Sequence, residues 1–331
     1  MEMKPGNVSQ TVYRRAIRKQ LHREHPSALF PPGQEESCYG IRRKEGCELI
    51  SSGVSLYGNE KDLCVFAMAQ AANHLASRGA VPEGISIHIM LPDFAYESRL
   101  KAMMAAAREA AEAQDLLLLE GEAQIVPGIR TSIVHVTAVG NAPREQILRS
   151  GGARPGQEIV LLKWIGLEGT LRIKRAKEAE LAERFVPAFL NQIEAYRPEI
   201  FSIRAMKTAA AIGVSAMHQI TSGGILASLW DMAEGAGIGL SVDMKKMTVR
   251  QETIEVCEYF HLNPYQLTGA GSVLAVTPKG EELADTLNRE GVPAVIIGHT
   301  TDSRERVIYN GDEMRYLDRP APDELARLSA Q

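Results

Sequence analysis

The stretch that most constrains the fold covers residues 214–224, which have the pattern of a strand, a tight turn and a helix start. Residues 214–218 alternate as in a short strand that ends at His218. The turn contains Thr221 and Ser222, either of which can cap a helix, and the helix opens on Gly223 and Gly224. Backbone N–H groups there lie at the positive end of the helix dipole, and glycine lets an anion approach them. The stretch predicts an anion site, and a buried helix start with a core histidine stays open as the alternative.

Length and composition indicate two globular domains and give no sign of a polymeric or membrane partner. A chain of 331 residues exceeds the usual size of one core, so we expect two domains of about 150 residues each. The chain is 45% hydrophobic and 24% charged, with a net charge of −4, which favours neither nucleic-acid nor membrane binding. Its amino terminus is charged, and no apolar run is long enough to span a membrane.

The cysteines fit a reducing compartment. The sequence has four of them, without a Cys-x-x-Cys pair and without histidines at the intervals of a metal site. A zinc site is therefore not expected, and we predict a cytoplasmic protein.

The first part of the chain mixes strands and helices around one sheet. Gly53 to Gly58 is predicted as a loop. Periodicity predicts helices over 8–23, 63–76 and 96–114, and strands near 47–52, 85–89, 116–119 and 133–139.

A stretch rich in glycine and proline over 141–157 marks a boundary, so we place one domain at 1–145 and another at 151–331. Glu158 to Trp164 reads as a buried strand that leads into a second glycine-rich turn, Gly166 to Thr170, and this turn is a further candidate anion site. Beyond it we expect helices near 175–196, 203–211, 250–260 and 279–290, and strands near 238–242, 273–276 and 294–297.

A series of motifs in the same order resembles the superfamily of aminoimidazole ribonucleotide synthetase, and the hydrogenase-maturation carbamoyl dehydratase branch is the most similar. The superfamily also includes thiamine-monophosphate kinase, selenophosphate synthetase and formylglycinamidine synthase. The resemblance covers nearly the whole chain. The motifs lie at Lys4–Ser9, Gln70–Ala80, Gly121–Pro127, Gly151–Gly156, Gly166–Thr170, His218–Gly224 and Gly235–Leu240.

The resemblance implies an α/β (α+β) fold of two domains, with a homodimer formed through the sheet of the amino-terminal domain. A second copy would also cover the open edge of a sheet with few strands. It further implies that ATP binds between the domains and that the chemistry is phosphoryl transfer or phosphate activation of an oxygen. His218, Asn73 and His74 fall at motif positions and are the candidate catalytic residues. The candidate phosphate contacts are Gly166, Gly169, Thr170, Thr221, Gly223 and Gly224.

The chain departs from the family at its acidic positions. The family's Gly-Asp-Asp-Ala is Gly40-Ile41-Arg42-Arg43 here, its Thr-Asp is Ser52-Gly53, its Asn-Asp is Asn73-His74, and its His-Asp is His218-Gln219. Mg²⁺ needs hard oxygen ligands, so its binding is not favoured and we predict no metal ligand.

Cationic side chains offer another way to neutralise a bound phosphate. Arg42 and Arg43, with Lys163 as a further candidate, could contact phosphate oxygens directly, and a solvated loop at 42–44 is the alternative. Glu122 and Glu168 are the carboxylates that could rebuild a metal site.

Three functions remain open from the sequence. The first is an enzyme or binding protein that takes ATP or another small phosphate-bearing or carboxylate ligand. The second is a catalytically silent homodimer that serves as a scaffold or regulatory partner. The third is a maturation enzyme of the carbamoyl dehydratase type. That enzyme needs a reactive cysteine at its extreme carboxy terminus, whereas the last cysteine here is Cys257.

Overall fold

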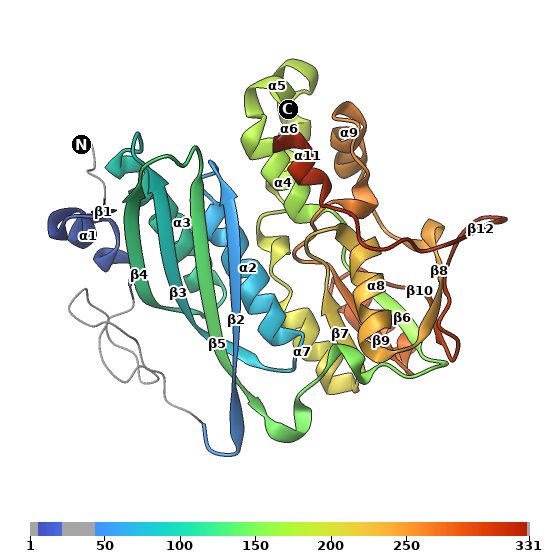
Figure 1. The fold of residues 1–331 in the computed structure, drawn as a ribbon. Coiled ribbons are helices and arrows are strands. Elements are labelled where there is room, and N and C mark those ends of the chain that lie inside the picture. Colours follow the sequence, from blue (N-terminus) through green and yellow to red (C-terminus); the bar gives the residue numbers. More distant parts are fainter. Residues whose placement is uncertain (1–5, 22–43, 330–331) are drawn as a thin grey trace. The chain divides into compact units, whose positions relative to one another are not determined.

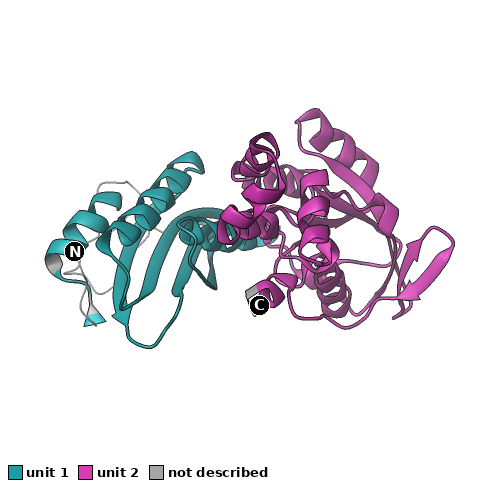
Figure 2. Ribbon diagram, turned by 90° about the horizontal axis from the view of Figure 1, so that it is seen from above, with its two compact units in different colours: residues 1–75, 80–145 teal, residues 76–79, 146–331 magenta. Residues whose placement is uncertain are grey.

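The computed structural model describes residues 6–21 and 44–329 and has a mixed α/β fold (Figure 1). The chain divides into two compact units (Figure 2). Unit 1 takes residues 1–75 and 80–145, and unit 2 takes residues 76–79 and 146–331. The predicted fold class is confirmed. Across the described ranges, no helix combines the length and the apolar character that crossing a bilayer requires.

In the described part of unit 1, five strands form one sheet in the order β1-β4-β3-β5-β2. Neighbouring strands are antiparallel except β3 and β4, which run parallel. The strands are β1 (Gly6–Asn7), β2 (Cys47–Gly58), β3 (Val81–Pro92), β4 (Leu117–Val126) and β5 (Ser132–Pro143).

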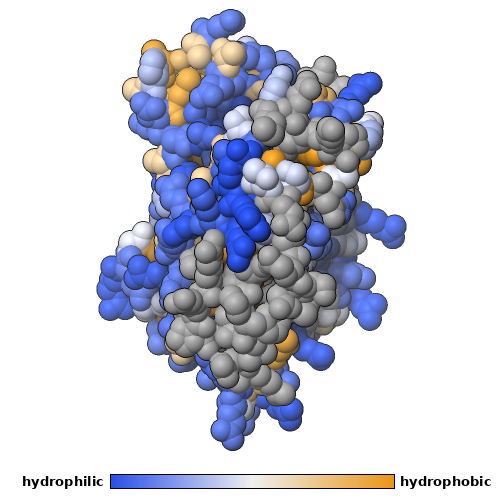
Figure 3. Space-filling model, turned by 90° about the vertical axis from the view of Figure 1, so that its left-hand side faces the viewer, coloured by the Kyte–Doolittle hydropathy of each residue, from blue (hydrophilic) through white to orange (hydrophobic). Residues whose placement is uncertain are grey.

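Helices cover one face of this sheet and leave the other face more exposed (Figure 1). Val134 and Val136 of β5 are fully buried, whereas His135 between them is exposed, as the two-residue period of a strand requires. The helices of unit 1 are α1 (Gln10–Ala16), η1 (Arg18–Gln20), α2 (Leu63–Ala76) and α3 (Glu97–Ala113). Seen from the side that carries α1, the described surface is mostly hydrophilic (Figure 3).

The described part of unit 2 contains a seven-stranded sheet in the order β12-β11-β8-β10-β6-β9-β7. Only β8 and β11 pair in parallel. The strands are β6 (Glu158–Leu162), β7 (Ala216–Gln219), β8 (Gly239–Asp243), β9 (Val273–Thr277), β10 (Ala294–Thr301), β11 (Arg306–Asn310) and β12 (Glu313–Tyr316).

Two hydrophobic cores lie on the opposite faces of this sheet. Ile159 and Leu161 of β6 belong to the core that also contains α8, while Val160 and Leu162 belong to the core that also contains α7 and α10. A strand buried on both faces has to be apolar throughout, which explains the apolar run in β6. The helices are α4 (Leu167–Ala176), α5 (Glu178–Arg184), α6 (Pro187–Glu194), α7 (Ile203–Ile212), α8 (Gly224–Ala236), α9 (Gln251–Tyr259), α10 (Gly280–Arg289) and α11 (Glu324–Ser329), with short 3-10 turns between some of them.

Three predicted elements were wrong in extent. The predicted loop at 53–58 is part of β2, which pairs with β5 along its whole length. The predicted helix at 8–23 ends at Ala16 and continues as the 3-10 helix η1. The predicted helix at 175–196 is the end of α4 followed by α5 and α6, and Pro187 starts the last of these because proline suits a first helical turn. Strands β11 and β12 and helix α11 were not predicted.

Candidate functional site

The turn between β7 and α8 is built for close approach to the backbone. Gly223 and Gly224 both have positive φ, +80° and +67°, which side chains rarely tolerate. The Gly224 amide donates to the Thr221 carbonyl at 3.0 Å and so closes the turn. A Cβ atom at residue 224 would overlap the carbonyl oxygen of Tyr265. The geometry therefore requires glycine at residue 224 for packing as well as for conformation.

An anion lies at this helix start, and it comes from the chain itself. The Gly223 amide donates to one carboxylate oxygen of Asp323 at 2.7 Å, and the Leu325 amide donates to the other at 2.8 Å. Burial, with a smaller contribution from the nearby Glu168, raises the pKa of Asp323 to about 6, against the opposing effect of the two amides and Arg172. The turn thus offers a backbone N–H to a carboxylate, the type of contact that the sequence predicted for an external ligand.

The second glycine-rich turn uses its polar groups inside the fold. The Gly169 amide donates to the Thr268 carbonyl at 3.0 Å, and a Cβ atom at residue 169 would overlap Leu267. The buried Thr170 hydroxyl donates to the Gly166 carbonyl at 2.8 Å and lies 3.0 Å from the Thr253 hydroxyl. These contacts join α4 to neighbouring segments of unit 2. In this structure Gly169 and Thr170 have no donor left for a phosphate.

Glu168, which the sequence offered as a possible metal ligand, is fully buried and bound within the fold. One of its carboxylate oxygens accepts from the Thr268 hydroxyl at 3.1 Å and from the Ala270 amide at 3.2 Å, and Arg172 lies 3.6 Å from the other. Its carboxylate is therefore engaged in holding α4 and the 268–270 segment together.

Lys163, which the sequence offered as a contact for phosphate, is also buried in the fold. Its ammonium donates to the carbonyls of Glu199 and Phe201 at 2.8 Å each and lies 3.1 Å from the Glu199 carboxylate. Burial lowers the pKa of Lys163. The interpretation of Lys163 as a phosphate contact is wrong for this structure, because its ammonium is engaged by backbone carbonyls.

His218 lies on β7 in a small polar cluster of unit 2. The Arg78 guanidinium donates to the Met217 carbonyl at 3.1 Å and to the Ser150 hydroxyl at 2.8 Å, and that hydroxyl lies 3.3 Å from Nδ1 of His218. Burial, with a smaller contribution from the charge of Arg78, lowers the pKa of His218 to about 4. His218 is thus a neutral imidazole near pH 7, with one ring nitrogen that donates a hydrogen bond and one that accepts. Sequence reasoning missed Arg78, although it lies in the same motif as Asn73 and His74.

The unit 1 candidates Asn73 and His74 lie on α2. Asn73 is fully buried. Nδ1 of His74 lies 3.1 Å from the Ser52 hydroxyl of β2. His74 stands where the resembling family has the acidic residue of its Asn-Asp pair, and its contact is with Ser52, the residue before Gly53, which stands at another acidic position of the family. Arg42 and Arg43 lie outside the described residues.

A polar cluster on the exposed face of the unit 1 sheet was not predicted. The two ring nitrogens of His88 on β3 lie 3.3 Å from Glu120 and 3.2 Å from Glu122, both on β4. The signal was available, because His88 alternates with the isoleucines of its strand. Within residues 6–21 and 44–329, no group of three histidine, cysteine or acidic side chains is arranged to hold a metal ion.

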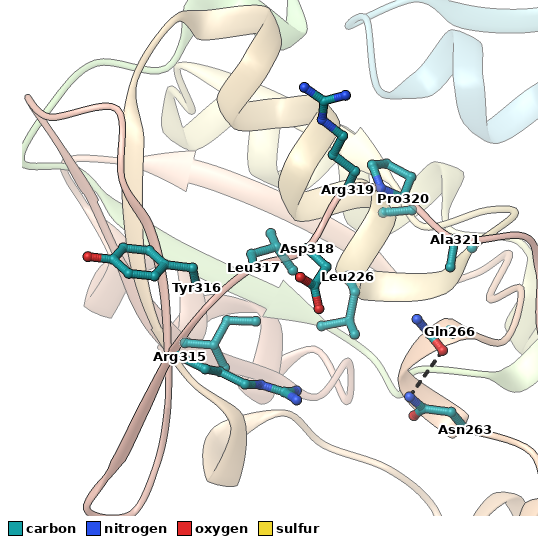
Figure 4. A pocket seen from close by; sticks show the side chains of 13 residues that line it. Leu226, Asn263, Gln266, Arg315, Tyr316, Leu317, Asp318, Arg319, Pro320 and Ala321 are labelled. Atoms are coloured by element: carbon teal, nitrogen blue, oxygen red, sulfur yellow. Dashed lines mark hydrogen bonds between the residues drawn. The ribbon is translucent and has the colours of Figure 1, made fainter.

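A small pocket lies beside the α8 turn (Figure 4). Gly223 and Leu226 form one side, the Asn263 and Gln266 side chains, hydrogen-bonded at 3.2 Å, form another, and residues 315–321 close it. Its volume of about 80 Å³ is well below the roughly 300 Å³ at which ligand pockets begin. The pocket therefore has room for water or a small ion but not for a whole nucleotide.

Comparison with known proteins gives the family. Residues 154–310 match the family model for the AIR synthase related protein, C-terminal domain, where AIR is aminoimidazole ribonucleotide. The carbamoyl dehydratase HypE of Rhodobacter capsulatus is 25% identical over 95% of this chain and 95% of its own length.

Two solved structures share the fold. A hydrogenase maturation protein HypE in complex with ATP superposes with a TM-score of 0.78 over 95% of each chain, at 16% identity. The thiamine-monophosphate kinase of Stenotrophomonas maltophilia superposes with a TM-score of 0.71 over 93% of this chain and 98% of its own, at 19% identity. Residues 154–310 therefore form an AIR synthase-related C-terminal domain. Along nearly its whole length the chain is similar to HypE proteins in sequence and in fold.

Proposed function

We propose that the protein binds ATP or another phosphate-bearing ligand and that the N-terminus of α8 contacts a phosphate group. The observation that carries this proposal is the Gly223 amide, which lies 2.7 Å from a carboxylate oxygen in a turn that only small residues can form. A helix start that stabilises a carboxylate has the charge and geometry to stabilise phosphate. The related HypE structure with ATP supports nucleotide as the ligand class.

We further propose that ligand binding depends only weakly on Mg²⁺ and that ATP turnover is slow or absent. Support comes from the family's acidic positions, which are neutral or basic here, and from His74, which stands at one of them and contacts the Ser52 hydroxyl. Mg²⁺ requires oxygen ligands, and phosphoryl transfer depends strongly on neutralising phosphate charge. His218 is the residue we assign to contact the ligand as a neutral imidazole, with Asn73 and His74 as the unit 1 candidates.

The test is calorimetric titration of ATP in Mg²⁺ and in EDTA, together with a phosphate-release assay. We expect the two dissociation constants to agree within about fivefold, a difference of about 1 kcal/mol, and phosphate release to stay near the background rate. A His218→Gln variant should bind more weakly, whereas His261→Gln, a change in another part of unit 2, should not. Tight binding that requires Mg²⁺, with steady hydrolysis, would restore an ordinary enzyme of the superfamily.

A second candidate is a homodimeric scaffold or regulatory partner, and the open face of the unit 1 sheet favours it. Leu49, Tyr57 and Met90 are 53%, 52% and 41% exposed on that face. The strand register places Tyr57 and Met90 on either side of the same β5 residue. Exposed apolar side chains grouped on one sheet face are typical of an interaction surface. We propose that a second copy of the chain covers this face.

Light scattering after gel filtration tests the dimer. Tyr57→Asp should shift the mass to that of a monomer, because it places a charge within the proposed interface. Val186→Asp is the matched control, since Val186 is 66% exposed but lies in unit 2. A wild-type protein that is monomeric at micromolar concentration would reject the dimer while leaving the ligand proposal untouched.

A further inference from the structure

We propose that residues 317–329 form a strap that competes with anionic ligands for the N-terminus of α8, with the Asp323 carboxylate as the competing group. This inference rests on the proposed phosphate site and adds its regulation. The strap would have to leave the Gly223 amide before a phosphate could accept a hydrogen bond from it.

The first support is the contact itself. Both carboxylate oxygens of Asp323 accept backbone hydrogen bonds, from Gly223 at 2.7 Å and from Leu325 at 2.8 Å. The two residues at the Gly223 contact are 100 positions apart, so this is not a local cap of α8. An N–H that donates to Asp323 is not free to donate to a phosphate oxygen at the same time in a good geometry. The carboxylate and the phosphate therefore exclude each other.

The second support is how the strap is attached. Its ends are held by the buried side chains of Leu317, Glu324 and Leu328, whereas residues 318–322 between them are exposed. Pro320 and Pro322 lack an amide hydrogen, so this stretch is poorly suited to pair as a strand. A segment with buried ends and an exposed middle can open locally without unfolding the unit.

The third support is the space beneath the strap. Residues 315–321 form one wall of the pocket beside Gly223, so part of the strap borders open space rather than α8 (Figure 4). The Asp318 side chain points toward Leu226, whereas Arg319 points away (Figure 4). The strap is therefore not packed against α8 along its whole length.

The charge environment weakens the contact at neutral pH. Burial and the neighbouring Glu168 raise the pKa of Asp323 to about 6, so the carboxylate is charged at pH 7.5 and largely protonated at pH 5. The Gly223 and Leu325 amides and the charge of Arg172 act against this rise in the pKa. The docked carboxyl takes up a proton more readily than a carboxyl in water does, so protonation favours the docked strap, and an anion should displace the strap less readily as the pH falls.

The experiment titrates ATP in EDTA into the full chain and into single variants. Asp323→Asn removes the charge, and Asp323→Ser also removes it while keeping a residue that caps α11 well. We expect both to lower the dissociation constant by about five- to thirtyfold, the range set by a carboxylate at a helix N-terminus. Asp318→Asn is the matched control, because it removes the same charge from the same strap without a bond to Gly223, and it should change affinity less than twofold.

Hydrogen exchange of the wild-type chain provides a second readout. Saturating ATP should increase exchange at residues 324–329 if the strap is displaced, and exchange there should not change if ATP binds elsewhere. Equal ATP affinity in wild type and both Asp323 variants would overturn the strap and leave the ligand proposal standing. An equal gain in Asp318→Asn would also overturn it, in favour of a general charge effect. Absence of ATP binding in every variant would instead reject the proposed function.

Discussion

The two glycine-rich turns of unit 2 have similar sequences and different roles. Each follows a strand of the same sheet, β6 or β7, and each starts a helix from a glycine in the left-handed conformation. At α4, Gly169 and Thr170 bind other segments of unit 2, and the Gly166 carbonyl accepts from Thr170. At α8, the Gly223 amide binds a carboxylate from the distant strap. A glycine-rich helix start therefore predicts close backbone packing, and only its surroundings decide whether a ligand can reach it.

The reason for each glycine differs as well. Gly169 is an ordinary helical residue that must be small because Leu267 packs against it. Gly224 has a positive φ, and the backbone of Tyr265 also occupies the space that a side chain at residue 224 would need. Single substitutions can separate these causes, and the following predictions do so in order of decreasing effect.

Gly224→Ala should give the largest loss of stability, about 3 kcal/mol or more, because it adds a backbone clash to conformational strain. Gly237 at the other end of α8 is the matched control, since it has the same φ of +67° and open space around its Cβ position. Gly237→Ala should cost only about 1 kcal/mol, the strain alone. Urea unfolding measures both. Equal losses would mean that the start of α8 relaxes away from Tyr265, and the distinction between strain and clash would fail.

Thr170→Val should destabilise the chain by about 1–2 kcal/mol, because it removes a buried donor and leaves the Gly166 carbonyl without that partner. Thr221→Val tests the other turn. In the described part of the chain no hydrogen bond of the Thr221 hydroxyl is found, so its loss should change stability by less than about 0.5 kcal/mol. Thermal unfolding compares the two variants. A Thr221→Val variant as unstable as Thr170→Val would show that both turns are structural in the same way.

Local patterns predicted most of the fold. The apolar stripe of α2, the alternation in β3 and the apolar run of β6 were all visible in the sequence, and the structure confirms each of these elements. Gly53 and Gly58 resembled a loop because glycine is weak in strands, yet pairing with β5 extends β2 through both. Here tertiary contacts outweighed local propensity.

The site was only partly predictable, because its decisive contacts join distant residues. The motif order identified His218 and the α8 turn. Arg78 reaches the Ser150 hydroxyl from 72 positions earlier in the chain, that hydroxyl contacts His218 a further 68 positions on, and Asp323 reaches Gly223 from 100 positions later. Such pairs leave no periodic signal in a single sequence. Whether the predicted site residues bind a ligand stays a prediction.

The smallest expected effect concerns the pH dependence of the α8 turn. The pKa of Asp323 is raised from its ordinary value of 3.8 to about 6, so the folded chain holds this proton more tightly than the unfolded chain does. The resulting stabilisation is fully present below pH 4 and is lost as the pH rises through 6. Because the side chain is partly exposed, we discount the shift to about 1 kcal/mol.

The measurement is the free energy of unfolding of wild type and Asp323→Asn from pH 4 to pH 8. As the pH falls, the free energy of unfolding of wild type should rise by about 1 kcal/mol relative to that of Asp323→Asn, because asparagine cannot take up the proton. His218 titrates in the same range with the opposite sign, since its pKa is lowered to about 4, but it contributes equally to both proteins and cancels in their difference. A difference that stays constant with pH would show that Asp323 has a similar pKa in the folded and unfolded chains. The α8 turn would then be as indifferent to pH as the uncharged contacts of the α4 turn.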